Sequence, residues 1–413
     1  MKLPSNGKSH QDVMRALHAS MQKDGRWEDG RTFFLVYGVD EGHLAMLQDA
    51  YSLFIATNGL GAGGMFPSLA KLESDILSSA CELLGGGNTA VGNITSGGSE
   101  SVLMGIRCAR ERARAERPEV TAPEMILPRS AHPAFWKAAD VLGIKPVVTP
   151  LTSNYVADVS ATEKAITKNT IVIIGSAPNY PFGTIDPIAD LAGLALRRGI
   201  HFHTDACVGG FSLPFLKKLG EDIPPFDFSI PGVSTISADL HKYGFAARGS
   251  SLILYRDKSL QELSRFVLNQ WSGGPYGTPT MAGSRPGGVV AAAWAIMQYL
   301  GEEGYLRLNR QMRSITRKLQ AGIESIPGFR VLGKPAMHLF AFTGEGRDMA
   351  AMAAELTRRG WFIHRQPTNP DSLHLLVTPI HERSTDKLLS DIREAAEATD
   401  ESTKGVRAAT YTQ

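Results

Sequence analysis

Short apolar runs that alternate with helical segments constrain the fold of this chain more than any other feature. The runs are four or five residues long and lie at 146–149, 171–175, 200–204 and 252–255. A segment with helical periodicity, 186–198, separates two of them. Parallel strands buried on both faces read as short, continuous apolar runs, and the helices between them cover the sheet. We therefore expect an α/β domain with a mainly parallel sheet.

The pattern changes near residue 285, where we expect a long amphipathic helix. Its apolar positions recur every three or four residues: Leu308, Met312, Ile315, Leu319, Ile323 and Ile326. Strand-like and helical segments then alternate, at 338–342, 348–359, 361–365, 374–377 and 384–398. This predicts a smaller α+β domain. We divide the chain into an N-terminal segment (1–57), a large domain (58–285) and a small C-terminal domain (286–413) with a polar tail at 399–413.

Composition and charge exclude several classes of protein. Hydrophobic residues make up 43% of the chain, which rules out a disordered or fibrous protein. The formal net charge is +2, whereas domains that bind nucleic acid are usually strongly basic. No segment has the roughly 20 consecutive apolar residues of a membrane-spanning helix, and residues 1–22 contain no apolar core of the kind expected in a signal peptide. Three widely spaced cysteines, Cys81, Cys108 and Cys207, indicate neither disulfides nor a metal site. We expect a cytoplasmic protein.

A glycine- and serine-rich segment at 95–101 (TSGGSES) directly precedes a helical pattern. Small residues such as Gly98 and Ser99 let the backbone approach an anion closely, and the free N–H groups of a helix N-terminus favour phosphate. The segment is therefore a candidate phosphate site. The alternative is an ordinary glycine-rich turn with a serine cap.

A lysine between two ring side chains is the candidate nucleophile. Lys242 follows His241 and precedes Tyr243 in an otherwise apolar, glycine-rich stretch. Such surroundings can lower the pKa of a lysine and allow it to form a Schiff base with an aldehyde. The alternative is a solvated surface lysine.

A carboxylate marks the end of one expected strand. Asp205 follows the apolar run 200–204, at the carboxyl end, where open α/β sheets bind their ligands. A buried carboxylate needs a partner, and a protonated heterocyclic nitrogen would serve. The alternative is an aspartate that caps the following turn.

Taken in order, these motifs resemble a known family. Together with SAHPAFWKAA (130–139), they are similar to pyridoxal-phosphate enzymes of the aspartate-aminotransferase fold, in the group II decarboxylase-like superfamily. APNYPFGTID (177–186), AGSRPG (282–287) and Phe66-Pro67 more narrowly resemble the sphingosine-1-phosphate lyase family. The resemblance runs from about residue 35 to 395 and implies a large, mainly parallel domain followed by a smaller α+β domain.

The resemblance assigns roles to individual residues. Lys242 would hold pyridoxal 5'-phosphate as a Schiff base, Asp205 would pair with its ring nitrogen, and His132 would stack on the ring. Gly98, Ser99 and His241 would bind the cofactor phosphate. Asn179 and Tyr37 match positions beside the cofactor and substrate, with Tyr37 and Lys242 as candidates for proton transfer.

The resemblance also implies a dimer. Gly273, Gly274 and Tyr276 are similar to a segment that crosses from the partner subunit to the cofactor phosphate. The active unit would then be a homodimer with shared active sites.

The implied reaction is a retro-aldol cleavage of a phosphorylated β-hydroxy-amine of the sphingoid-base type. Its products would be an aldehyde and phosphoethanolamine. One alternative is an amino-acid decarboxylase, in which Arg285 or Arg248 would hold the substrate carboxylate. Another is cleavage of a different β-hydroxy-amine. A third is a cofactor-binding relative without activity, against which the complete set of Lys242, Asp205 and His132 argues.

The substrate side departs from the family pattern in two places. Family members usually have Asn-Pro-Leu-His where this chain has Asn58 followed by Gly59, Leu60 and Gly61, so that the histidine expected at the substrate phosphate is absent. Arg248 replaces a usual lysine and retains the positive charge.

Three further side chains could have functional or structural roles. Arg285 either binds an anionic substrate group or forms a structural salt bridge. We expect His374 and His381, which lie on or beside a strand of the small domain, to have structural roles.

Overall fold

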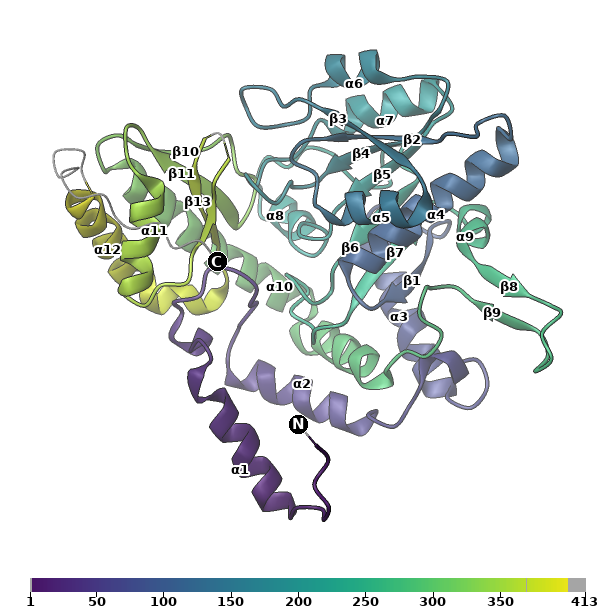
Figure 1. Cartoon of the computed structure of the whole chain (residues 1–413), viewed down its shortest axis with the longest axis horizontal. Coiled ribbons are helices and arrows are strands. Elements are labelled where there is room, and N and C mark those ends of the chain that lie inside the picture. The colour runs from purple at the N-terminus through teal and green to yellow at the C-terminus, as the bar shows by residue number, and fades with distance from the viewer. Residues whose placement is uncertain (1, 369, 400–413) are drawn as a thin grey trace.

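A seven-stranded sheet forms the centre of the large domain (Figure 1). The computed structural model describes residues 2–368 and 370–399, so most of the predicted polar tail lies outside it. The strand order is β1 (Val91–Thr95), β7 (Ser251–Tyr255), β6 (Thr235–Ala238), β5 (His201–Asp205), β4 (Thr170–Ser176), β2 (Glu124–Pro128) and β3 (Lys145–Thr149). The last five strands in this order run parallel, whereas β7 is antiparallel to both neighbours. This confirms the expected mainly parallel sheet.

Helices cover both faces of this sheet, as the alternating pattern predicts. They are α3 (Pro67–Leu83), α4 (Gly98–Glu116), α5 (Ala134–Leu142), α6 (Val159–Ala165), α7 (Ile188–Arg197), α8 (Leu213–Lys218) and α9 (Lys258–Ser264). One core joins α4 and α5 to β2, with Phe135 packed near Met125. A second core joins α7 and α8 to β4 and β5, with Leu191 and Leu213 near Phe202.

The small domain has an antiparallel sheet with two helices against it. Its strand order is β10 (Phe329–Val331), β11 (Leu339–Gly344), β13 (Ser372–Leu376) and β12 (His364–Gln366). The helices are α11 (Met349–Arg358) and α12 (Thr385–Ala398), and a 3-10 helix, η4 (Pro379–Ser384), precedes α12. The segments expected as strands and helices are all present, with shifted ends, and β10 is an additional strand.

One long helix, α10 (Gly287–Glu324), connects the two domains. Gly301 interrupts it with φ 54°, a conformation that glycine adopts without the usual steric cost. Val290 and Ile296, before this kink, belong to the large-domain core, whereas Leu319 and Ile323, after it, belong to the small-domain core. The helix begins at the predicted domain boundary, and its first half packs with the large domain.

The N-terminal segment contacts both domains. It contains α1 (His10–Ser20), the short 3-10 helices η1 (Met21–Lys23) and η2 (Trp27–Asp29), and α2 (Glu41–Leu53), with η3 (Gly59–Gly61) just after it. Phe33 lies fully buried in the small-domain core, and its N–H donates to the Phe362 carbonyl. Phe33 thus ties the predicted N-terminal segment (1–57) to the small-domain core, while α2 packs along α10.

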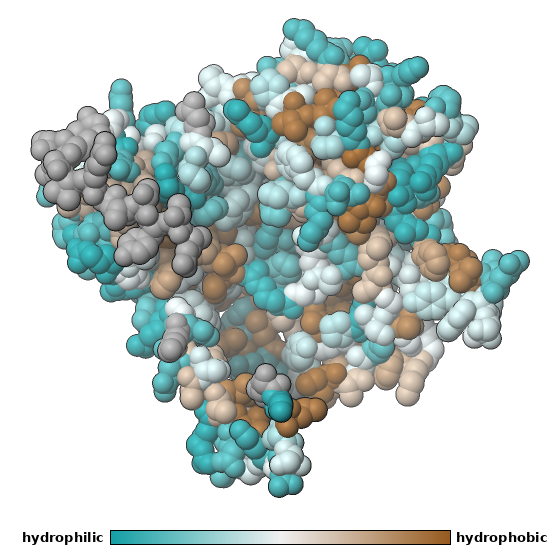
Figure 2. All heavy atoms as spheres, viewed as in Figure 1, coloured by the Kyte–Doolittle hydropathy of each residue, from teal (hydrophilic) through white to brown (hydrophobic). Residues whose placement is uncertain are grey.

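Apolar side chains remain exposed on two elements at the periphery. Every residue of α1 is exposed, and Figure 2 shows brown, apolar side chains at the lower edge of the molecule, around α1 and α2. A hairpin of β8 (Phe266–Leu268) and β9 (Tyr276–Thr278) projects from the large domain (Figure 1) and exposes Trp271. None of the helices within residues 2–368 and 370–399 is long and apolar enough to cross a membrane.

Candidate active site

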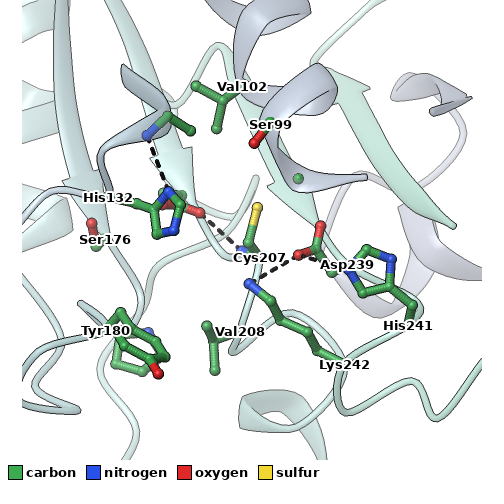
Figure 3. A pocket seen from close by; sticks show the side chains of 14 residues that line it. Ser99, Val102, His132, Ser176, Tyr180, Cys207, Val208, Asp239, His241 and Lys242 are labelled. Atoms are coloured by element: carbon green, nitrogen blue, oxygen red, sulfur yellow. Dashed lines mark hydrogen bonds and ion pairs between the residues drawn. The ribbon is translucent and has the colours of Figure 1, made fainter. Parts of the chain in front are cut away.

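A cavity of about 220 Å³ lies where several parallel strands end. It is lined by Gly98, Ser99, Val102, His132, Ala134, Ser176, Pro178, Tyr180, Asp205, Cys207, Val208, Asp239, His241 and Lys242. These residues follow or end the strands β1, β2, β4, β5 and β6, because the carboxyl ends of parallel strands meet at one edge of a sheet. Figure 3 shows His132, Ser176 and Tyr180 along one side of the pocket, and Asp239, His241 and Lys242 along the other.

The structure brings together six residues that the sequence predicted separately: Gly98, Ser99, His132, Asp205, His241 and Lys242. Gly98 is the first residue of α4, so the free N–H groups of the first helical turn lie at the pocket. A Cβ atom on Gly98 would lie 2.9 Å from both carboxylate oxygens of Asp239 and 3.0 Å from Cys207 Sγ. Only glycine therefore lets the start of α4 approach the side chains of Asp239 and Cys207 this closely.

An ion pair holds Lys242 in the pocket. Its Nζ lies 2.9 Å from Asp239 Oδ2, and the Asp239 side chain is 1% exposed. Ser251 donates a hydrogen bond to Asp239 Oδ1. Burial lowers the pKa of Lys242, but the negative charge of Asp239 outweighs this effect and the pKa is raised. The sequence pattern predicts a lowered lysine pKa, whereas in the chain by itself the carboxylate of Asp239, three residues earlier, raises it.

Asp205 is held by two donors. Its Oδ1 accepts hydrogen bonds from the Cys207 backbone N–H at 3.0 Å and from Ser237 Oγ at 3.2 Å. The nearby His132 accepts a hydrogen bond at Nδ1 from the Ala134 N–H at 3.1 Å, so its neutral ring carries the proton on Nε2. Desolvation lowers the pKa of His132, and the charge of Asp205 partly offsets this effect.

His241 carries an unused polar atom beside the first turn of α4. Its Nε2 lies 3.6 Å from Asp239 Oδ2, whereas its buried Nδ1 has no hydrogen-bond partner in the described part of the chain. A buried polar atom without a partner is costly and often marks the place of a ligand. The orphaned nitrogen, the free N–H groups at Gly98, the Asp205 carboxylate and the Lys242 amine together fit a phosphorylated pyridine aldehyde.

Tyr37 and Arg248 form a pair next to this pocket. The Arg248 guanidinium lies 5.1 Å above the Tyr37 ring, and the Tyr37 ring packs edge-on against Tyr243 at 5.0 Å. Arg248 Nη1 also donates to the His241 carbonyl at 3.3 Å. Burial raises the pKa of Tyr37, although the positive charge of Lys242 acts in the opposite direction. Tyr37 therefore carries its proton at neutral pH.

Other predicted residues do not line this cavity. Arg285 forms an ion pair with Glu73 and bonds the Gly59 carbonyl, which favours its structural interpretation. Asn58 accepts from the Arg285 backbone N–H and donates to Ser284.

Two further groups of predicted residues also lie elsewhere. The Asn179 side chain bonds Tyr155, Phe182 and Thr184, which fixes its own loop. Gly273 and Gly274 lie in the loop between β8 and β9.

Two histidines of the small domain, His374 and His381, have structural partners, in line with the expectation. His374 Nε2 lies 3.0 Å from the Tyr180 carbonyl, and burial lowers the pKa of His374 to about 3. His381 and Thr378 form a capping box at the start of η4, and burial lowers the pKa of His381 to about 4. Tyr180 packs against His374 and lines the pocket. It was not predicted as a site residue, although it lies in the motif APNYPFGTID.

Comparisons with known proteins identify the family of the chain. Residues 1–344 match the pyridoxal-dependent decarboxylase conserved domain. Sphingosine-1-phosphate lyase of Oryza sativa subsp. japonica is 40% identical over 403 residues, which are 96% of this chain and 74% of that protein. The solved structure of Burkholderia pseudomallei sphingosine-1-phosphate lyase superposes with a TM-score of 0.93 at 38% identity, covering 97% of this chain and 93% of that one. A probable L-tyrosine/L-aspartate decarboxylase of Methanothermobacter thermautotrophicus is 36% identical and covers 83% of this chain and 92% of its own length.

The fold, the pocket and the family match define a pyridoxal-phosphate-dependent enzyme, whose pocket is lined by a lysine, an aspartate and a histidine. The chain belongs to the pyridoxal-dependent decarboxylase family, and within it to the sphingosine-1-phosphate lyases.

Proposed function

We propose that this protein cleaves the Cα–Cβ bond of a phosphorylated, long-chain β-hydroxy-amine and releases an aldehyde and phosphoethanolamine. The observation that carries the proposal is the convergence of Lys242, Asp205 and His132 on one cavity in a chain that is 38–40% identical to sphingosine-1-phosphate lyases over nearly its whole length.

The residues of the pocket divide the work between holding the cofactor and moving protons. When bound, pyridoxal phosphate supplies an aldehyde for covalent attachment and a ring that withdraws electrons from the bond to be broken. Gly98, Ser99 and His241 would hold its phosphate, and Asp205 would keep its ring nitrogen protonated. Asp239 stabilises the amine of Lys242 whenever that amine is free, because the two groups lie 2.9 Å apart.

Tyr37 is the proposed group for proton transfer at the substrate hydroxyl. It is protonated at neutral pH because burial raises its pKa, so it can take the hydroxyl proton only by passing its own proton to a neighbour, for which the amine of Lys242 is the candidate. The neighbouring charges of Arg248 and Lys242 lower the cost of a transient phenolate. Lys242, whose amine is free once the substrate has taken its place, would return a proton to the carbon from which the aldehyde has left.

Arg248 is the proposed contact for the substrate phosphate. Its replacement by alanine should weaken a phosphorylated substrate roughly 10- to 100-fold more than its unphosphorylated analogue, because a hydrogen bond to a charged group contributes about 1.5–3 kcal/mol. Binding of both compounds to the cofactor-loaded protein would be measured by fluorescence titration. Arg248→Lys, which retains the charge, is the matched control and should keep most of the preference. Equal weakening of both compounds would contradict the phosphate role.

A product assay with sphinganine 1-phosphate tests the reaction itself. Mass spectrometry should detect a long-chain aldehyde and phosphoethanolamine in equal amounts from protein loaded with pyridoxal phosphate. This result would also show that glycine at position 61 is compatible with the reaction, although relatives usually carry a histidine there. No turnover by a protein with normal covalent cofactor would contradict this substrate class.

An amino-acid decarboxylase is the second candidate function. The 36% identity to a probable L-tyrosine/L-aspartate decarboxylase favours it. However, the guanidinium of Arg285 is occupied by Glu73, which leaves Arg248 as the candidate for a substrate carboxylate. Release of carbon dioxide from tyrosine or aspartate, without aldehyde formation from the phosphorylated amine, would select this function.

We further propose that the active unit is a homodimer. The loop with Gly273 and Gly274 lies on a projecting hairpin and does not line the cavity of its own chain, and the hairpin exposes Phe266, Val267 and Trp271. Exposed apolar patches of this kind mark protein–protein contacts. A partner's hairpin would complete the phosphate side of each pocket. A cytoplasmic location stays a prediction from the sequence.

A further inference from the structure

A continuous chain of buried polar side chains runs beneath the candidate active site. It starts at His201 and passes through Thr235, His203 and Ser237 to Asp205; we call these five residues the polar chain. The hydroxyl of Thr235 lies 2.9 Å from both His201 Nε2 and His203 Nδ1. The hydroxyl of Ser237 lies 3.2 Å from both His203 Nε2 and Asp205 Oδ1.

Strand geometry explains why these five residues meet. Successive side chains of a strand point to opposite faces, so His201, His203 and Asp205 share one face of β5. Thr235 and Ser237 share the corresponding face of β6, and the parallel register pairs Thr235 with His203 and Ser237 with Asp205. Helices α4 and α5 cover these side chains, and Phe135 of α5 packs against His203.

The hydrogen bonds of the polar chain can be assigned a single direction. An ionised carboxylate only accepts, so Ser237 donates to Asp205 and must itself accept from His203 Nε2–H. The neutral His203 ring then accepts at Nδ1 from Thr235, which in turn accepts from His201 Nε2–H. His201 Nδ1 then carries no proton. It has no partner in the described residues, so it is an acceptor without a donor and not an N–H group without an acceptor.

The protonation of the histidines agrees with this direction. Burial lowers the pKa of His203 to about 4, against the opposing charge of Asp205, so its ring is neutral at neutral pH. Burial also lowers the pKa of His201. Every donor therefore points along the chain toward Asp205, and hydrogen bonds aligned in this way polarise one another.

We infer that Ser237 and His203 are positioning residues that keep Asp205 ionised and directed at the ring nitrogen of the cofactor. The inference rests on the proposed function, in which Asp205 protonates that nitrogen. Loss of the Ser237 hydroxyl would favour transfer of the shared proton from the ring nitrogen to Asp205, because the ionised carboxylate would lose a donor. The cofactor would then withdraw electrons less strongly.

The ring nitrogen itself provides the test. Protein loaded with ¹⁵N-labelled pyridoxal phosphate would be examined by solid-state NMR, in which the ring-nitrogen shift reports the protonated fraction. Ser237→Ala should move this shift toward the unprotonated value and lower the ratio of protonated to unprotonated nitrogen roughly tenfold, since a hydrogen bond to a charged group is lost. His203→Leu should move it in the same direction, whereas His203→Gln, which retains an N–H donor, should stay near the parental value.

Two reference variants separate the possible failures. Thr204→Val removes a buried hydroxyl from β5 that has no hydrogen-bond partner in the described residues, and should leave the shift unchanged. Asp205→Asn sets the value expected without the carboxylate. A parental shift in both Ser237→Ala and His203→Leu would overturn the inference while leaving the role of Asp205 intact. A parental protein that already matches Asp205→Asn would overturn the role of Asp205 and the inference with it.

Discussion

Replacement of Lys242 by alanine should abolish the visible absorbance of covalently bound cofactor. Lys242 is the lysine that lines the pocket, and its Nζ lies 2.9 Å from Asp239, from where it could reach the aldehyde of a cofactor whose phosphate is held by Gly98 and His241. Turnover should fall by more than the roughly 10²- to 10⁴-fold that one proton-transfer group contributes, because covalent attachment is lost as well. An absorbance spectrum and a single-turnover assay would measure the two effects.

Borohydride reduction followed by peptide mapping would identify the modified lysine directly. Lys217→Ala, on the exposed end of α8, is the control and should retain both the absorbance and the labelled peptide. A cofactor that remains covalently attached to the Lys242→Ala protein would refute the assignment of Lys242.

Two variants that are inactive on their own should regain activity when their chains are mixed. Gly274→Asp places a negative charge in the hairpin loop, and it should repel the cofactor phosphate of the partner subunit. A side chain at Gly274 meets no atom within 4 Å in its own chain, although its φ of +99° strains any residue but glycine. Gly274→Asn has the same size and strain without the charge, so it should remain much more active than Gly274→Asp.

Mixing the Gly274→Asp and Lys242→Ala chains should produce dimers with one intact site. Random association of the two chains in equal amounts gives about one quarter of the active sites of the same amount of parental dimer, although each variant alone is inactive. Native mass spectrometry would establish that mixed dimers have formed, and the product assay would measure the recovered activity. Mixed dimers without activity, or a parental monomer with full activity, would contradict shared active sites.

The residues that were predictable from the sequence lie in short motifs at the ends of strands. Asp205 follows a buried apolar run, and Lys242 lies in a distinctive local sequence, so both were found without any knowledge of distant contacts. Asp239 lies in the same motif as Lys242, but the ion pair depends on the path of the loop, which the sequence pattern does not specify.

The remaining differences arise from tertiary contacts. Asn58 and Arg285 are bonded to one another although they are 227 residues apart, and no local pattern predicts such a pair. The strand β6 was not predicted because Thr235 and Ser237 interrupt its apolar character. Both hydroxyls belong to the polar chain. The polar residues that kept β6 from being predicted are therefore part of the chain that supports Asp205 in the structure.

The place of Phe33 has a consequence for biosynthesis. Its N–H and carbonyl bond Phe362 and Leu376, and its ring lies in a core formed by the last quarter of the chain. A ribosome therefore releases this segment early, while its binding site is still hundreds of residues from being synthesised. The large domain can collapse during translation, but Phe33 can dock only after the strands that hold it, up to Leu376, have been synthesised.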